Sequence, residues 1–148
     1  MKNHLPAIVA GVGATIAIFL LALVDSLQSE FMLLMAPFGA SAVLVFGIPN
    51  SPLAQPKNVI LGHLLTAFIG VVFVMLFPVE PWSLALATGL AVSAMLMTKT
   101  THPPAGANPL LIMMAGQGWE FLIFPVFIGA IAIVAVGQLM KKVVPKAE

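Results

Sequence analysis

Three amino acids are missing from this sequence, and charge is scarce in it. The 148 residues include no arginine, no tyrosine and no cysteine, and only 7% of them are charged. Without cysteine there is no disulfide framework and no thiolate to act as a ligand or nucleophile. A formal net charge of +1 provides no basic field for binding nucleic acid. A soluble domain carries about 25% charged residues, so this composition argues against a soluble protein.

Hydrophobic residues make up 61% of the chain instead. The charged residues divide it into charge-free stretches, at 3–24, 31–56, 58–79, 81–98, 100–119 and 121–140. A helix needs about 20 apolar residues to cross a bilayer. Plain spanning helices are predicted at 5–24, 58–77, 82–98 and 121–140.

The stretches 31–56 and 100–119 are broken by proline and glycine. The sequence therefore predicts an all-α membrane protein with a single transmembrane domain over 1–148, and we interpret the first stretch as a retained helix rather than a signal peptide.

The order of the charges predicts how the segments cross the membrane. If the N-terminus is cytoplasmic and all six stretches cross, all six lysines fall on the cytoplasmic side, as the positive-inside rule favours. Both termini are then cytoplasmic, and the protein is expected in the inner (cytoplasmic) membrane of the cell. In the alternative, the two broken stretches are re-entrant loops, only four segments cross, and Lys57 and Lys99 lie outside.

The two broken stretches resemble each other. A shift of 67 residues aligns Pro37 with Pro104, Gly39 with Gly106, Gly62 with Gly129 and Gly70 with Gly137. Three segments precede Glu80 and three follow it, so a first repeat (1–79) and a second repeat (80–148) would be inverted in the membrane. Inverted repeats with matching Pro/Gly breaks indicate a transporter site near the midplane. Two Pro-kinked helices packed through glycine are the alternative interpretation.

The breaks also predict the charge of the ligand. We expect Pro37 and Pro104 each to open a half-helix, whose free N–H groups and dipole attract an anion. Without arginine there is no bidentate clamp for a phosphate group, so a small inorganic anion is favoured. The predicted substrate-binding residues are the small or neutral residues of both breaks: Phe38, Gly39, Ala40, Ser41, Gly106, Ala107 and Asn108.

Two histidines lie in or beside the apolar segments. His102 precedes the second break and His63 lies in the following helix of the first repeat. An imidazole titrates near neutral pH, so both are candidates for proton coupling or gating. A structural hydrogen bond is the alternative for each of them.

Polar residues at the cytoplasmic ends of the segments are candidates for anion entry. Lys57 and Lys99 would attract anions, and Gln55 and Asn58 would line the mouth. The alternatives are a topology signal for the lysines and helix capping for the amides.

Enzymatic activity is not expected. The sequence has no Walker loop, no His-Glu-x-x-His pattern and no carboxylate pair within a membrane segment. No metal site and no cofactor are predicted. The expected partners are a small inorganic anion, the lipid bilayer and, because the bundle is small, further copies of the chain.

The stretch 101–107 reads Thr-His-Pro-Pro-Ala-Gly-Ala and resembles the signature of the HPP family, named for its His-Pro-Pro tripeptide. Residues 37–42 and 51–58 are similar to other blocks of that family. The resemblance covers nearly the whole chain and implies a membrane protein, usually described with four spanning helices. The chain departs from the family pattern at Asn108-Pro109 and at Lys57, where arginine is common.

The resemblance also bears on function, because plant relatives in chloroplast envelopes are associated with nitrite transport. It makes nitrite the leading substrate of a small-anion transporter. The alternative is a membrane sensor or assembly subunit that binds a ligand or partner without transport.

Overall fold

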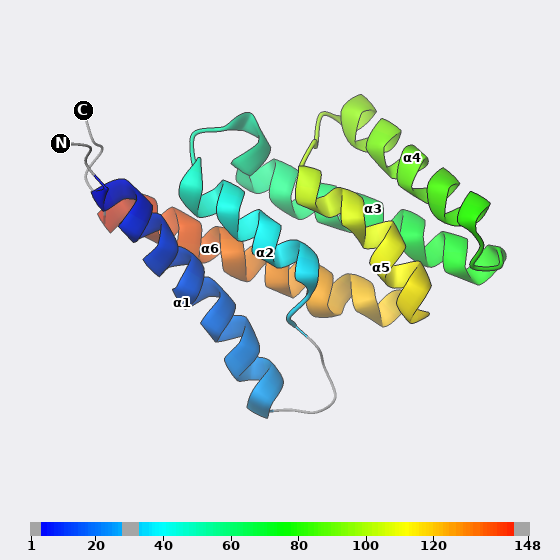
Figure 1. Cartoon of the computed structure of the whole chain (residues 1–148), viewed down its shortest axis with the longest axis horizontal. Helices are drawn as coiled ribbons and strands as arrows, with labels where there is room; N and C mark the ends of the chain where they lie inside the picture. The colour runs from blue at the N-terminus through cyan, green and yellow to red at the C-terminus, as the bar shows by residue number, and fades with distance from the viewer. Residues whose placement is uncertain (1–3, 28–32, 144–148) are drawn as a thin grey trace.

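A computed structural model describes residues 4–27 and 33–143 of the chain. Within these ranges every regular element is helical. Six α-helices are joined by shorter π and 3-10 turns (Figure 1): α1 (Leu5–Leu27), α2 (Ala36–Ala42), α3 (Pro56–Leu76), α4 (Pro81–Thr98), α5 (Asn108–Ala115) and α6 (Ile128–Val143). The prediction of an all-α chain is confirmed.

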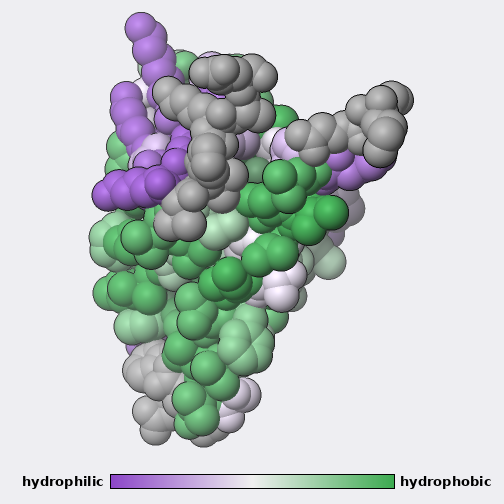
Figure 2. Space-filling model, turned by 90° about the vertical axis from the view of Figure 1, so that its left-hand side faces the viewer, coloured by the Kyte–Doolittle hydropathy of each residue, from purple (hydrophilic) through white to green (hydrophobic). Residues whose placement is uncertain are grey.

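Four helical stretches are long and apolar enough to cross a membrane: Leu5–Leu27, Pro56–Leu76, Pro81–Thr98 and Trp119–Lys142. They coincide with the four plain stretches predicted from the sequence. Figure 2 shows a largely hydrophobic surface on the face it draws, with hydrophilic residues gathered toward the top of the view. An apolar surface of this extent is suited to contact with lipid rather than water.

The two broken stretches form short helices that change pitch. Helix α2 continues as a π-helical turn over Val43–Gly47, and a 3-10 helix over Pro103–Ala107 leads into α5. Neither is long enough by itself for a plain span. Pro37 lies in the first turn of α2, as predicted.

The second break differs from the prediction. Pro104 does not open an α-helix, because it lies within the 3-10 helix, and α5 begins only at Asn108. The N–H of Ala105 donates to the carbonyl oxygen of His102 at 2.9 Å, which is the i to i+3 bond of a 3-10 turn. Pro103 and Pro104 have no N–H, so neither can donate a bond that would favour α pitch.

Successive helices run in alternating directions along the diagonal of Figure 1. The turns after the first break and after α4 lie at one end of the bundle, where Lys141 Nζ donates to the carbonyl oxygen of Pro49 at 2.7 Å. Lys57 and Lys99 lie at this end too, which we call the lysine end. Lys2 and Lys146 are outside the described residues.

The described carboxylates lie at the other end, which we call the carboxylate end. Glu80 caps α4 there by a reciprocal pair of hydrogen bonds with Ser83. Asp25, at the end of α1, accepts hydrogen bonds from the backbone N–H groups of Leu33 and Leu34. Within the described residues, the lysines therefore lie at one end of the bundle and the carboxylates at the other.

Two glycines allow the long helices to approach the starts of the broken segments. A Cβ atom at Gly62 of α3 would lie 2.8 Å from the carbonyl oxygen of Thr100. A Cβ atom at Gly129 of α6 would lie 3.2 Å from the carbonyl oxygen of Leu33. Gly62 is needed because the Thr100 carbonyl has little room to move, and Gly129 because a Cβ there would overlap the ring of Phe38.

A second pair of glycines repeats this arrangement farther along the same helices. A Cβ at Gly70 would lie 3.2 Å from Cβ of Ile112, and one at Gly137 would overlap Val45. The contacted residues of both pairs are related by the same 67-residue shift as the glycines. Each long helix therefore packs against the broken segment of the other half of the chain.

Candidate functional site

A completely buried polar network lies where both broken segments meet α3. It consists of Ser41 from α2, His63 and Thr66 from α3, His102 at the start of the second break, and Asn108 from α5; each is 0% exposed. Polar side chains cut off from water need partners within the protein. The hydrogen bonds of the network therefore determine what it can do.

Ser41 joins the two histidines. Its Oγ lies 2.8 Å from Nε2 of His63 and 2.8 Å from Nε2 of His102. The centroids of the two imidazole rings are 5.0 Å apart. The hydroxyl also lies 3.2 Å from the carbonyl oxygen of Pro37, one turn earlier in the helix. A hydroxyl has a single proton to donate, so it must choose among these neighbours.

The outer partners of the histidines set the direction of the hydrogen bonds. Nδ1 of His102 lies 2.7 Å from the carbonyl oxygen of Leu53, which can only accept, so Nδ1 carries a proton. Nδ1 of His63 lies 3.1 Å from the amide nitrogen of Asn108, which can only donate. The proton of a neutral His63 is therefore on Nε2. His63 then donates to Ser41, and Ser41 donates to His102.

Asn108 connects α5 to α3. Its amide nitrogen donates to the carbonyl oxygen of His63 and to Oγ1 of Thr66, both at 3.0 Å. A flipped amide would place two carbonyl oxygens in contact, so these partners fix the orientation. Asn108 Oδ1 is left buried without a partner. Asn108 is one of the predicted substrate-binding residues, and the group that it leaves free is an acceptor.

Close packing positions the histidines. Phe38 contacts His63 edge to face, with ring centroids 5.3 Å apart. On the other side, Gly62 admits His102, whose Cβ lies 3.1 Å from the place that a Cβ at Gly62 would occupy. The absence of a side chain at Gly62 therefore brings His102 within reach of Ser41.

The other predicted ligands are not in the network. A Cβ atom at either break glycine would meet no atom within 4 Å. One helical residue is turned about 100° from the next, so residues adjacent to Ser41 point elsewhere. The small residues outside the network are exposed or half-buried: Gly39, Ala40, Gly106 and Ala107.

The predicted entry residues lie at the lysine end. Lys57 and Lys99 are exposed. The amide of Gln55 donates to two carbonyl oxygens of the turn that precedes it. The amide of Asn58 donates to the carbonyl oxygen of Thr101 at 3.0 Å. Both amides hold turns beside the network and are engaged in this conformation.

Thr66 and two backbone carbonyls belong to the network but were not predicted from the sequence. Thr66 follows His63 by three residues, a spacing that places both on one helix face, so this signal was available. The carbonyl oxygens of Leu53 and Pro37 have no signal in the sequence, since every residue carries one. They enter the network only because the turns bring them to the imidazole and the hydroxyl.

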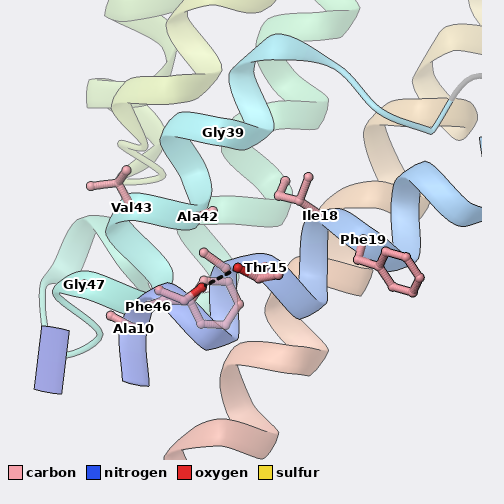
Figure 3. A pocket seen from close by; sticks show the side chains of 11 residues that line it. Ala10, Thr15, Ile18, Phe19, Gly39, Ala42, Val43, Phe46 and Gly47 are labelled. Atoms are coloured by element: carbon pink, nitrogen blue, oxygen red, sulfur yellow. Dashed lines mark hydrogen bonds between the residues drawn. The ribbon is translucent and has the colours of Figure 1, made fainter. Parts of the chain in front are cut away.

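A separate groove of about 680 Å³ lies between α1 and the first break (Figure 3). Its lining is apolar except for Thr15, whose hydroxyl donates to the carbonyl oxygen of Gly11 at 2.9 Å. Gly39 faces this groove, whereas Ser41 does not line it. Such a surface suits the packing of hydrocarbon and offers nothing to an anion.

Comparison with known proteins places the chain among membrane proteins. A family model described as "HPP, transmembrane region" matches residues 1–148. A transmembrane protein of Dictyostelium discoideum is 37% identical over 115 residues, which cover 72% of this chain and 40% of the relative. A second from that organism is 39% identical over 127 residues, covering 78% of this chain and 41% of the relative. The chain thus spans about two fifths of these relatives' length. No solved structure matches the chain.

Proposed function

This chain belongs to the HPP family of membrane proteins, and we propose that it transports a small monovalent anion, with nitrite as the first candidate. The observation that carries the proposal is the buried network of Ser41, His63, His102 and Asn108. Polar side chains at membrane depth are costly, and they commonly mark the path of a substrate. Nitrite comes first because the sequence resemblance points to it.

The chemistry of the network favours an anion. Its titratable groups are two imidazoles, which can gain positive charge but cannot become negative. The described carboxylates Asp25, Glu80 and Glu120 lie at the carboxylate end, away from it. A buried imidazolium is costly without a counter-charge. A transported anion would supply that counter-charge, and would be released again when the proton leaves.

The arrangement of the segments supports alternating access, in which the binding site opens to one side of the membrane at a time. Both breaks contribute to the network, which is closed to both sides in this conformation because its side chains are fully buried. We propose that residues 1–79 and 80–148 are inverted repeats that exchange conformations and so expose the network to each side in turn. The support for this is the matched pair of glycine contacts made by α3 and α6.

The same repeats imply six crossings with both termini cytoplasmic, in the inner membrane of the cell. The gathering of Lys57, Lys99 and Lys141 at one end supports this orientation through the positive-inside rule. The short helices of the breaks would then cross together with the π-helical turn over Val43–Gly47 and the 3-10 helix over Pro103–Ala107.

The test is nitrite uptake into proteoliposomes that contain only this protein. We expect saturable uptake above empty liposomes, and a drop of at least about tenfold in Ser41→Ala, because the link between the histidines is lost. Ser93→Ala is the matched control, since Ser93 is an exposed hydroxyl on α4. Nitrite binding without uptake would instead favour the sensor or assembly subunit. Neither binding nor uptake of nitrite or another small anion would refute the proposal.

A further inference from the structure

We propose that His63, Ser41 and His102 form a binding site for one excess proton, and that the Ser41 hydroxyl turns from His102 to the carbonyl oxygen of Pro37 when the proton arrives. The existence of this proton site follows from the hydrogen-bond geometry alone. Its use in transport rests on the proposed function.

The neutral network leaves one place for a proton. Nδ1 of His102 donates to Leu53, and Nε2 of His63 donates to Ser41. Of the two unprotonated ring nitrogens, Nε2 of His102 is the one that faces the serine, and it accepts a hydrogen bond from Ser41 Oγ at 2.8 Å. A proton delivered by a hydronium ion forms one N–H bond there as its O–H bond to water breaks, and no covalent bond of the network breaks.

Protonation of His102 requires the serine hydroxyl to turn. Its Nε2 then donates to Ser41 Oγ, so the hydroxyl proton needs another acceptor. The carbonyl oxygen of Pro37 lies 3.2 Å from Oγ and can take it. Ser41 then accepts from both imidazoles and donates to Pro37. Every donor keeps an acceptor, so the network holds the added proton without an unpaired group.

A second proton has no comparable place. It would bind Nδ1 of His63, which lies 3.1 Å from the amide nitrogen of Asn108, a group that cannot accept a hydrogen bond. Turning that amide would bring Oδ1 against the carbonyl oxygen of His63, now an acceptor at 3.0 Å. Two imidazolium rings would also stand 5.0 Å apart in a site without water. The capacity of the network is therefore one excess proton.

No fixed charge near the network balances that proton. Within the described residues, the parts of α2, α3, α4 and α5 that surround it contribute only the two histidines as titratable groups. Lys57 and Lys99 are exposed at the lysine end, and Lys141 is bound to Pro49. In transport, the anion can supply this counter-charge, so one proton should accompany each monovalent anion.

Nitrogen NMR of the full chain in lipid bilayers tests the proton site. The protein carries ¹⁵N-labelled histidine and His4→Gln, which leaves only the buried pair visible. We expect opposite neutral tautomers, Nδ1–H on His102 and Nε2–H on His63, and then one imidazolium per chain on acidification. The same tautomer on both rings, or protonation of both together, would overturn the proposal.

Variants separate the serine switch from general packing. In Ser41→Ala, at the pH where half of the parent protein is protonated, we expect the protonated fraction to fall at least tenfold. Ser41→Thr keeps the hydroxyl and should titrate as the parent does, as should Ser93→Ala. If Ser41→Ala fails to fold, the tautomers and the proton count of the parent still decide the question. Unchanged protonation in folded Ser41→Ala refutes the switch.

Flux measurements separate this proposal from the proposed function. One-to-one movement of proton and anion transfers no net charge, so nitrite uptake should not respond to a potassium diffusion potential set with valinomycin. Uptake that follows the potential would overturn the coupling. One shared proton in the NMR experiment, together with no uptake of any small anion, would refute the transport function and leave the proton site standing.

Discussion

Thr66 shows how one hydroxyl differs from another in the same kind of helix. Its Oγ1 donates to the carbonyl oxygen of Gly62 at 2.9 Å, and Thr88 Oγ1 donates to Leu84 in the same way at 2.8 Å. Only Thr66 also accepts a hydrogen bond from the buried amide of Asn108. The two threonines therefore share a backbone interaction, and Thr66 alone has a role in the network.

We predict that Thr66→Val destabilises the protein by about 1–3 kcal/mol, because it removes an acceptor from a buried donor. Thr88→Val loses only its local backbone bond and should cost less than about 1 kcal/mol. Equilibrium unfolding in detergent micelles measures both changes. Equal effects of the two substitutions would show that the bond from Asn108 contributes nothing to stability.

At the scale of residues, the sequence identified some members of the network and could not identify others. Ser41 and Asn108 stand out at matching positions of the two breaks, and His63 and His102 as histidines in or beside apolar segments; the structure brings the four together. Their roles in binding an anion remain predictions. Gly39 and Gly106 lie outside the network because the rotation of each short helix depends on tertiary packing, and their place beside an anion also stays a prediction.

At the scale of elements, charge-free length predicted the long helices well and the pitch of the short ones poorly. A run of about 20 apolar residues between charges has one stable form in a bilayer, so α1, α3 and α4 follow from it. A short helix with several prolines has competing forms. Whether residues 103–107 adopt α or 3-10 geometry depends on what packs against them. The four long helices also agree in number with the four spanning helices that the resemblance to the HPP family implied, and two short helices are added to them.

The packing of α3 against the turn after α4 gives a prediction at this scale. A methyl group at Gly62 would lie 2.8 Å from the Thr100 carbonyl and 3.1 Å from His102 Cβ, so α3 must move away from the turn. We expect Gly62→Ala to cost about 1–3 kcal/mol of stability, as overpacking usually does, and to disturb His102. Unfolding and the His102 ring signals would measure the two effects.

Gly89 on α4 provides the control for this substitution. A Cβ there would meet nothing within 4 Å. Alanine favours a helix over glycine by about 1 kcal/mol, so Gly89→Ala should be neutral or stabilising. A Gly62→Ala protein as stable as Gly89→Ala, with unchanged His102 signals, would contradict the close approach of α3 to the turn.

At the scale of the whole molecule, the charges indicate the direction in which each segment runs between the two ends of the bundle. Alternating charge along the sequence predicted alternating segments, and the described lysines and carboxylates do lie at opposite ends of the bundle. The packing of each long helix on the other half's broken segment was not visible in the sequence. This packing depends on contacts between residues far apart in the chain. The spacing of the glycines indicates these contacts only once the residues that the glycines touch are known.

Cysteine labelling decides between six crossings and four, because the natural chain has no cysteine and gives no background. Lys57→Cys, Glu80→Cys and Lys99→Cys are each treated with a membrane-impermeant maleimide in intact cells and in inverted vesicles. With six crossings, Glu80→Cys reacts from outside, whereas the two lysine positions react only from the cytoplasmic side. With re-entrant breaks the pattern reverses at all three positions. In that case the broken segments would enter and leave on one side, and the repeats would be parallel. The alternating helix directions of the fold favour the first result, since each short helix runs opposite to the long helix that precedes it.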